Sequence, residues 1–131
     1  MADNGLTTIA SHHAVKDTID RLEAEVKAKG MTVFARIDHA KGARDVGLAL
    51  RPTELLIFGN ARAGTPLMQA QQTAGIDLPL KALAWEDAAG KVWLSSNEPA
   101  WVAARHGIAA GGPTQAMSAA LAAVTTAAAE P

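Results

Sequence analysis

The chain has 131 residues, a length that supports one folded domain and is too short for two. Hydrophobic residues make up 49% of it and charged residues 19%, a composition typical of a folded domain. Its 12 lysines and arginines are interleaved with 13 aspartates and glutamates, so we expect no nucleic-acid partner. Cysteine is absent, which excludes disulfides, thiolate catalysis and cysteine-ligated metals. The first residues lack a secretory-signal pattern and no apolar run reaches 18 residues, so we expect no membrane partner and a cytoplasmic location.

The first part of the chain alternates between extended and helical patterns. Residues 6–10 form a short β-prone run that predicts a first strand. Residues 14–29 repeat apolar side chains at helical spacing, with charged residues on the other side, which predicts an amphipathic helix. Residues 31–37 are predicted to form a strand that brings Asp38 and His39 to its C-terminal end.

The middle of the chain predicts a buried strand between two short helical segments. Residues 40–47 are helix-compatible but short, so we expect one or two turns. The apolar run 55–58 is typical of a central strand, and Gly59-Asn60 favours a bend after it. Thr65-Pro66 has the form of an N-cap and a first-turn proline, which predicts a short helix over residues 67–72.

The last third predicts a β-hairpin followed by two helices. Residues 80–86 and 91–96 flank a four-residue connection that ends at Gly90, as in a hairpin. A helix is predicted from Glu98 to Arg105. The alanine-rich residues 114–129 predict a helix with a narrow apolar stripe, and we expect the last five residues of the chain to fray.

This order of elements predicts an α+β fold in which a single-layer antiparallel or mixed sheet of about five strands carries packed helices. We expect one domain over residues 1–131, with residues 112–131 as a C-terminal helix.

Several ordered motifs resemble a bacterial family known as domain of unknown function 302. They are Gly30-Met31-Thr32-Val33-Phe34-Ala35-Arg36-Ile37-Asp38-His39, Leu55-Leu56-Ile57-Phe58-Gly59-Asn60, Gly64-Thr65-Pro66-Leu67-Met68, Asp77-Leu78-Pro79-Leu80-Lys81 and Trp93-Leu94-Ser95-Ser96-Asn97-Glu98-Pro99. The resemblance covers about residues 6–108 and leaves out the tail after Gly111. Ala61 stands where the family usually has proline after the glycine-asparagine pair, so we expect a looser turn there. The resemblance implies a small α/β protein, often dimeric, and it implies no reaction.

Asp38 and His39 form the most suggestive polar pair, since an acid and an imidazole suit acid-base chemistry or metal ligation. Neighbouring side chains on an extended chain point to opposite faces, however, so the two need not share a site. The structural alternative is that Asp38 caps the following turn while His39 packs under a loop.

Asn60 and Lys81 are the other candidate ligand-binding residues. Asn60 offers an amide next to a glycine, and Lys81 offers a cation at the start of a strand, where it could pair with Asp77 or Asp38. A plain turn and an exposed strand-end lysine are the structural alternatives. The adjacent pair His12-His13 lacks metal-ligand spacing, so we expect no bound metal and no cofactor.

These observations favour a small-molecule-binding or regulatory module with a polar pocket near Asp38, His39, Asn60 and Lys81. One alternative is an enzyme that uses His39 as general base or as a weak metal ligand, and another is a structural dimer without ligand. The high apolar content predicts a homodimer, formed through an exposed sheet face or through the terminal helices.

Overall fold

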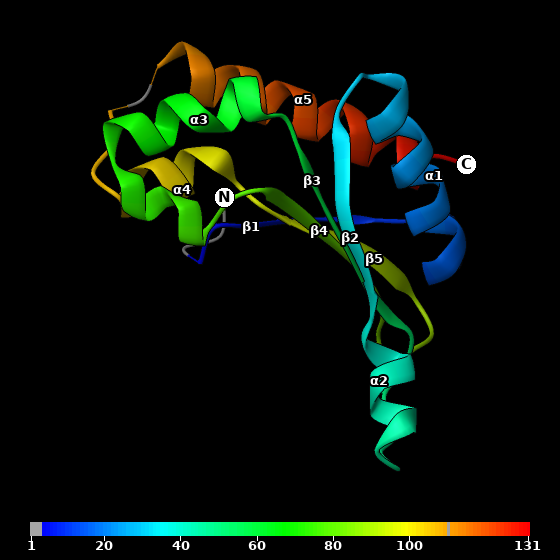
Figure 1. Ribbon diagram of the computed structural model, residues 1–131. Helices are drawn as coiled ribbons and strands as arrows, with labels where there is room; N and C mark the ends of the chain where they lie inside the picture. Colours follow the sequence, from blue (N-terminus) through cyan, green and yellow to red (C-terminus); the bar gives the residue numbers. More distant parts are fainter. Residues whose placement is uncertain (1–3, 110) are drawn as a thin grey trace.

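The computed structural model describes residues 4–109 and 111–131, which form one antiparallel sheet with helices packed on it (Figure 1). The strands are β1 (Leu6–Ala10), β2 (Thr32–Asp38), β3 (Thr53–Gly59), β4 (Leu80–Glu86) and β5 (Val92–Asn97). The helices are α1 (Val15–Ala28), α2 (His39–Asp45), α3 (Ala61–Ala70), α4 (Pro99–Arg105) and α5 (Gly112–Ala129), and a short 3-10 helix, η1 (Gln72–Ile76), follows α3. The strand order is β1-β5-β4-β3-β2, with every neighbouring pair antiparallel, which confirms the predicted α+β fold class.

The core lies on the face of the sheet that α1 and α5 cover. The buried side chains of α1 recur at helical spacing and pack against Leu56 and Phe58 of β3 and against Leu94 of β5. Since α1 and α5 also contact each other, the two helices close this side of the sheet (Figure 1). Within residues 4–109 and 111–131, no helix combines the length and the apolar character needed to cross a membrane.

The β4–β5 hairpin was the clearest local prediction from the sequence, and it is confirmed. The Asp87 carboxylate accepts hydrogen bonds from the backbone N–H groups of Ala89 and Lys91 and from the indole N–H of Trp93. These bonds, that from Trp93 above all, lower the pKa of Asp87. Gly90 adopts a φ of +82°, a left-handed conformation that side chains disfavour, so the turn requires glycine there.

The opposite face of the sheet, which we call the open face, carries half-exposed apolar side chains. It presents Ala35, Ile37, Leu55, Ile57, Leu83, Trp85 and Trp93, which are linked across the strands by their pairing register. Trp85 and Trp93 stack with ring centroids 6.3 Å apart, as expected for partners on a hairpin. Figure 1 shows α1, α3 and α5 together on the other side of the sheet.

Helix α3 begins earlier than the sequence predicts. Thr65 was expected as the N-cap, but the helix starts at Ala61, and the Asn60 side chain accepts the hydrogen bond from the Arg62 backbone N–H at 2.9 Å. Pro66 therefore lies inside the helix, where it cannot donate the usual backbone hydrogen bond.

The C-terminal helix ends at Ala129, as the sequence predicts, and begins two residues earlier than predicted, at Gly112. Fraying was expected over the last five residues, but α5 continues to Ala129, so that expectation is wrong for residues 127–129. The Arg21 guanidinium of α1 donates hydrogen bonds to the carbonyl oxygens of Ala127, Ala128 and Glu130, at 2.9 to 3.2 Å. Capping of the final carbonyls by a cation from another helix holds this end in place.

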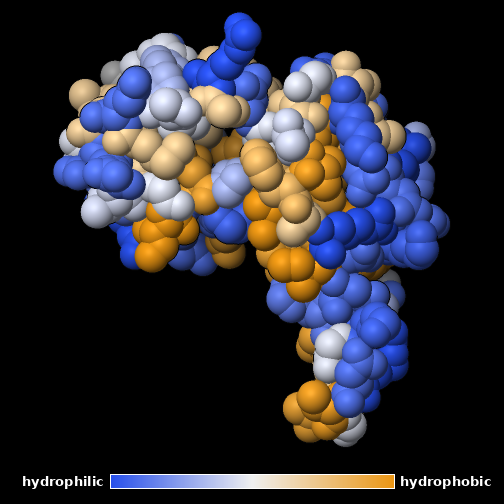
Figure 2. Space-filling model, in the orientation of Figure 1, coloured by the Kyte–Doolittle hydropathy of each residue, from blue (hydrophilic) through white to orange (hydrophobic). Residues whose placement is uncertain are grey.

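Helix α2 stands apart from the rest of the molecule. Residues 39–52, which we call the α2 arm, leave the sheet after β2 and return to it at β3 (Figure 1). The arm exposes Val46, Leu48 and Leu50, so apolar surface gathers at its end (Figure 2).

We predict that Phe58→Ala lowers the free energy of unfolding by about 3 to 5 kcal/mol, because Phe58 is fully buried and its loss leaves a cavity. Phe34→Ala is the matched control, since Phe34 is 55% exposed and should change the stability by less than about 1 kcal/mol. Guanidinium denaturation of both variants measures the difference. Equal losses would contradict the placement of Phe58 in the core.

Candidate functional site

The candidate site residues lie at two opposite edges of the sheet. Asp38 ends β2 and pairs with Glu54 at the start of β3, whereas Asn60 directly follows the end of β3. Asn60 lies six residue steps after Glu54 along an extended strand, which corresponds to about 20 Å. The structure therefore does not bring Asp38 and His39 together with Asn60 in one pocket.

Asp38 and His39 occupy the start of α2. The Asp38 carboxylate accepts a hydrogen bond from the Lys41 backbone N–H at 2.9 Å and so acts as the N-cap. His39 is the first helical residue and is exposed. Asp38 lines a hollow of about 300 Å³ together with Arg44, Glu54 and other residues, and His39 is not part of its lining.

Lys81 lies near the same edge as Asn60 but on the open face. Its ammonium group donates to the carbonyl oxygens of Asp77 at 3.3 Å and Pro79 at 3.2 Å. Burial lowers the pKa of Lys81, and the nearby charge of Asp77 opposes part of that shift. The side chain thus stabilises the loop before β4, with its charge held close to backbone oxygens.

The expected pairing of Lys81 with the Asp77 carboxylate is replaced by another set of contacts. Both carboxylate oxygens of Asp77 accept hydrogen bonds from Arg105, at 2.9 and 3.0 Å. One of these oxygens also forms a short hydrogen bond with the His106 Nε2 atom. The other ring nitrogen of His106 contacts the Thr73 hydroxyl at 2.9 Å. This chain of bonds joins η1 to the end of α4, since all its members lie in or beside those two elements.

A larger cavity of about 580 Å³ lies at the Asn60 edge, and we call it the α3–α5 cavity. Its walls come from the ends of β2 and β3, from α3, from the loop before β4 and from α5. It is lined by Lys29, Met31, Phe34, Gly59, Asn60, Ala61, Ala63, Gly64, Thr65, Met68, Leu78, Pro79, Leu80, Ala116, Met117 and Ala120. The cavity exists because glycine and alanine occupy many of the facing positions, where larger side chains would fill the space.

A β-bulge places an aromatic ring at the edge of this cavity. Val33 pairs with Phe58 and Ala35 with Ile57, so Phe34 is the extra residue between two paired positions. A bulge redirects the side chain it carries, and Phe34 remains 55% exposed while it lines the cavity. A half-exposed aromatic beside an apolar hollow is a surface that a ligand can cover.

The lining of the α3–α5 cavity is mostly apolar. Among the described residues that line the α3–α5 cavity, Lys29 alone is charged, and neither a histidine nor a carboxylate takes part. General acid-base catalysis needs a titratable group within reach of the substrate. In the described parts of the chain, histidine and carboxylate side chains also form no cluster of metal-binding size.

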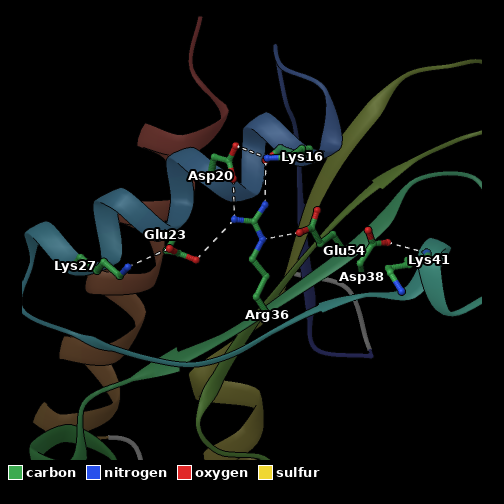
Figure 3. Close-up of polar contacts among 8 residues, drawn as sticks. All are labelled: Lys16, Asp20, Glu23, Lys27, Arg36, Asp38, Lys41 and Glu54. Carbon is green, nitrogen blue, oxygen red and sulfur yellow. Dashed lines mark hydrogen bonds and ion pairs between the residues drawn. The ribbon is translucent and has the colours of Figure 1, made fainter.

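A second polar centre surrounds Arg36 on β2 (Figure 3). Its guanidinium lies 2.7 Å from the Asp20 carboxylate of α1, 3.7 Å from that of Glu23, and forms a short ion pair with Glu54 of β3. Hydrogen bonds from Arg36 and Lys16 lower the pKa of Asp20. Although burial opposes the charge of Arg36, its bonds to Glu54 and Asp20 raise its pKa. Because these carboxylates offset its charge, the centre is a structural link between α1 and the sheet.

Sequence reasoning identified one residue of the cavity and missed the others. Asn60 was a candidate, but Met31, Met68 and Met117 come from three distant segments that only the fold brings together. No spacing rule could have connected them. Phe34 carried a weak signal, since a large aromatic on the polar face of an alternating strand has no partner in a simple strand pattern.

A solved structure shares this fold. The crystal structure of an uncharacterised conserved DUF302 protein from Bacillus stearothermophilus matches with a TM-score of 0.81, and the match covers 96% of this chain and 98% of that one. Sequence identity is 18%, so the likeness concerns the fold alone.

Curated relatives match a large part of the chain at higher identity. A protein named fluoride-specific ion channel FluC 1 from Brucella suis biovar 1 is 57% identical over 106 residues, which are 81% of this chain and 42% of the relative. FluC 1 of Brucella abortus and FluC 2 of Brucella melitensis match at the same identity over 39% of their length. The chain therefore spans about two fifths of the length of these relatives.

Residues 7–126 match a family described as a domain of unknown function. The matched residues include most of α5, so they extend past the limit near residue 108 that the sequence motifs suggested. The motifs, the shared fold and this match agree, and the chain belongs to the domain of unknown function family DUF302.

Proposed function

We propose that the chain is a small-molecule-binding or regulatory module whose ligand occupies the α3–α5 cavity. The observation that carries this proposal is the cavity itself, since about 580 Å³ lies within the range of about 300 to 1,000 Å³ typical of small-molecule sites. Its lining is mostly apolar and has a few polar groups, among them Asn60, Thr65 and Lys29. Such a lining supplies affinity through apolar burial and orientation through its few polar contacts.

The enzyme alternative based on His39 has less support. His39 is exposed at the start of α2, at the edge of the sheet opposite the cavity, and lies outside both hollows. A general base must reach the proton it removes in a bound substrate. Binding to the α3–α5 cavity would leave His39 about a strand length away from the ligand.

We predict that Gly64→Leu abolishes binding of the neutral fluorescent probe N-phenyl-1-naphthylamine, or weakens it at least about tenfold. Gly64 lines the cavity, and a Cβ atom there would meet Leu78 Cδ1 at 3.7 Å, an ordinary contact, so the longer leucine side chain can enter the free space. The measurement is the rise in probe fluorescence on titration with protein.

Gly42→Leu is the matched control for this experiment. It makes the same change in helix α2, where a Cβ atom meets nothing within 4 Å, and it gains the same helix propensity. This variant should bind the probe as the natural chain does. The proposal fails if the natural chain does not bind the probe, or if Gly64→Leu binds it equally well.

A second candidate function is that of a module that acts on a fluoride channel. The module itself would lie outside the membrane, in the cytoplasm, which is the compartment that the sequence predicts. The supporting observation is the 57% identity to part of proteins named fluoride-specific ion channels. A channel must cross a membrane, yet no helix in the described part of this chain could do so. The unmatched three fifths of the relatives would then hold the channel, and the matched part would act on it.

Removal of the matched segment from the Brucella suis relative tests this candidate. We predict that the shortened channel still conducts fluoride into and out of proteoliposomes, since its membrane part remains, but at a changed rate. Addition of this chain should restore the original rate, and Gly64→Leu should restore it less well if cavity binding regulates the channel. Equal fluoride efflux from the full-length and shortened proteins would contradict the candidate.

We also propose that the module is a homodimer formed through the open face and the α2 arm. The open face carries apolar side chains that no helix of the described chain covers, and the arm exposes Val46 and Leu48 at 72% and 66%. Figure 2 shows apolar surface at the end of the arm and along the side of the body beside it. A two-fold arrangement lets each arm cover the sheet of the other copy.

Sedimentation velocity at micromolar concentration tests the homodimer, which should have twice the 13.5 kDa mass of the chain. Leu48→Glu should give monomers, because it places a charge on the proposed interface. The control is Ile76→Glu, since Ile76 in η1 is 75% exposed and lies outside the open face and the arm. A monomeric natural chain, or a dimer that survives Leu48→Glu, would contradict this interface.

A further inference from the structure

The interior of the α3–α5 cavity suits a flexible apolar chain. Met31, Met68 and Met117 contribute to its walls from three separate segments, beside Leu78 and Leu80. Methionine side chains are unbranched and adaptable, so they conform to apolar ligands without a fixed shape. An interior of this kind offers few hydrogen bonds, so a polar group of the ligand must lie at the edge.

The charge at the edge of the α3–α5 cavity determines which kind of polar group a ligand can place there. Lys29 follows the last turn of α1, is exposed, and is the one charged residue among the described residues that line the cavity. Its neighbour Lys27 is already paired with Glu23 at 3.0 Å, whereas no acidic side chain in the described residues forms an ion pair with Lys29. A free cation beside an apolar hollow attracts an anionic head group.

Asn60 adds a second polar contact at the same cavity. Its side-chain oxygen is used to cap α3, where it accepts the Arg62 N–H, so its amide group retains N–H donors. The first turn of α3 forms part of the wall here and presents the positive end of the helix dipole. Both features complement negative charge and agree with the sign of Lys29.

We infer that the ligand is an amphiphile with an unbranched acyl chain and an anionic head, of the fatty carboxylate class. This inference rests on the proposed cavity function. The chain lies among the methionine and leucine side chains of the cavity, and the carboxylate lies at the edge within reach of Lys29 and Asn60. Phe34, which the bulge exposes at this edge, covers the part of the chain next to the head.

Displacement of N-phenyl-1-naphthylamine by decanoate, decanol and decyltrimethylammonium tests the head group. Each probe has a straight chain of ten carbons, with the carboxylate carbon of decanoate counted as the tenth, and each is used below its critical micelle concentration. Decanoate should bind most tightly and decyltrimethylammonium most weakly. Octanoate should bind about fifteenfold more weakly than decanoate, because each buried methylene contributes about a fourfold change in affinity.

Lys29→Gln should weaken decanoate binding about fivefold, the size of an exposed ion pair, and leave decanol binding unchanged. Lys27→Gln is the matched control, since it removes the same charge two residues earlier on α1 and outside the cavity lining. It should leave the affinities of both probes unchanged. Melting curves of both variants confirm that they are folded.

The outcomes separate this inference from the proposed function. If decanol binds as tightly as decanoate, or if Lys29→Gln and Lys27→Gln behave alike, the anionic head is wrong while cavity binding stands. If the natural chain binds none of the probes, the cavity function itself fails. Binding to phosphatidylglycerol vesicles without binding of monomeric decanoate would overturn the inference in favour of a membrane surface.

Discussion

The main constraint on this fold is that its helices cover less area than the sheet presents. The two long helices, α1 and α5, can cover only one face of the five-stranded sheet. Helix α1 supplies the larger apolar side chains, and α5 packs beside it through Met117, Leu121 and Val124. Where α5 lines the cavity, it presents Ala116 and Ala120 beside Met117. Small side chains bring helices close together but fill little volume. Where α5 meets α3 rather than α1, the volume that these side chains leave unfilled forms the α3–α5 cavity. The other face of the sheet remains the open face.

Local patterns predicted most of the fold because they report interactions between residues close in sequence. The α1 stripe, the hairpin with Gly90 and the buried run at Phe58 all belong to this class. One error came from a choice between two local caps, and the other from a group that is distant in sequence. Thr65-Pro66 matches a helix start in isolation, but the Asn60 side chain begins the helix earlier, and the end of α5 is held by Arg21 from a helix about a hundred residues away.

The candidate site was predicted less well, for a geometric reason. Polar residues at the ends of successive strands come together when the strands are parallel, because their C-terminal ends share one edge. In this antiparallel sheet, the ends of β2 and β3 lie at opposite edges, which separates Asp38 and His39 from Asn60. Lys81 is the second residue of β4, at the Asn60 edge, but strand alternation turns it to the other face.

The position of the α2 arm bears on how this protein can diversify. Residues 39–52 leave and rejoin the sheet at the edge opposite the α3–α5 cavity, and none of them lines that cavity. Insertions or replacements in the arm would therefore leave the cavity walls intact, since long surface connections tolerate changes in length. Selection, or protein engineering, can exchange the arm and refine the cavity as two independent traits of one small scaffold.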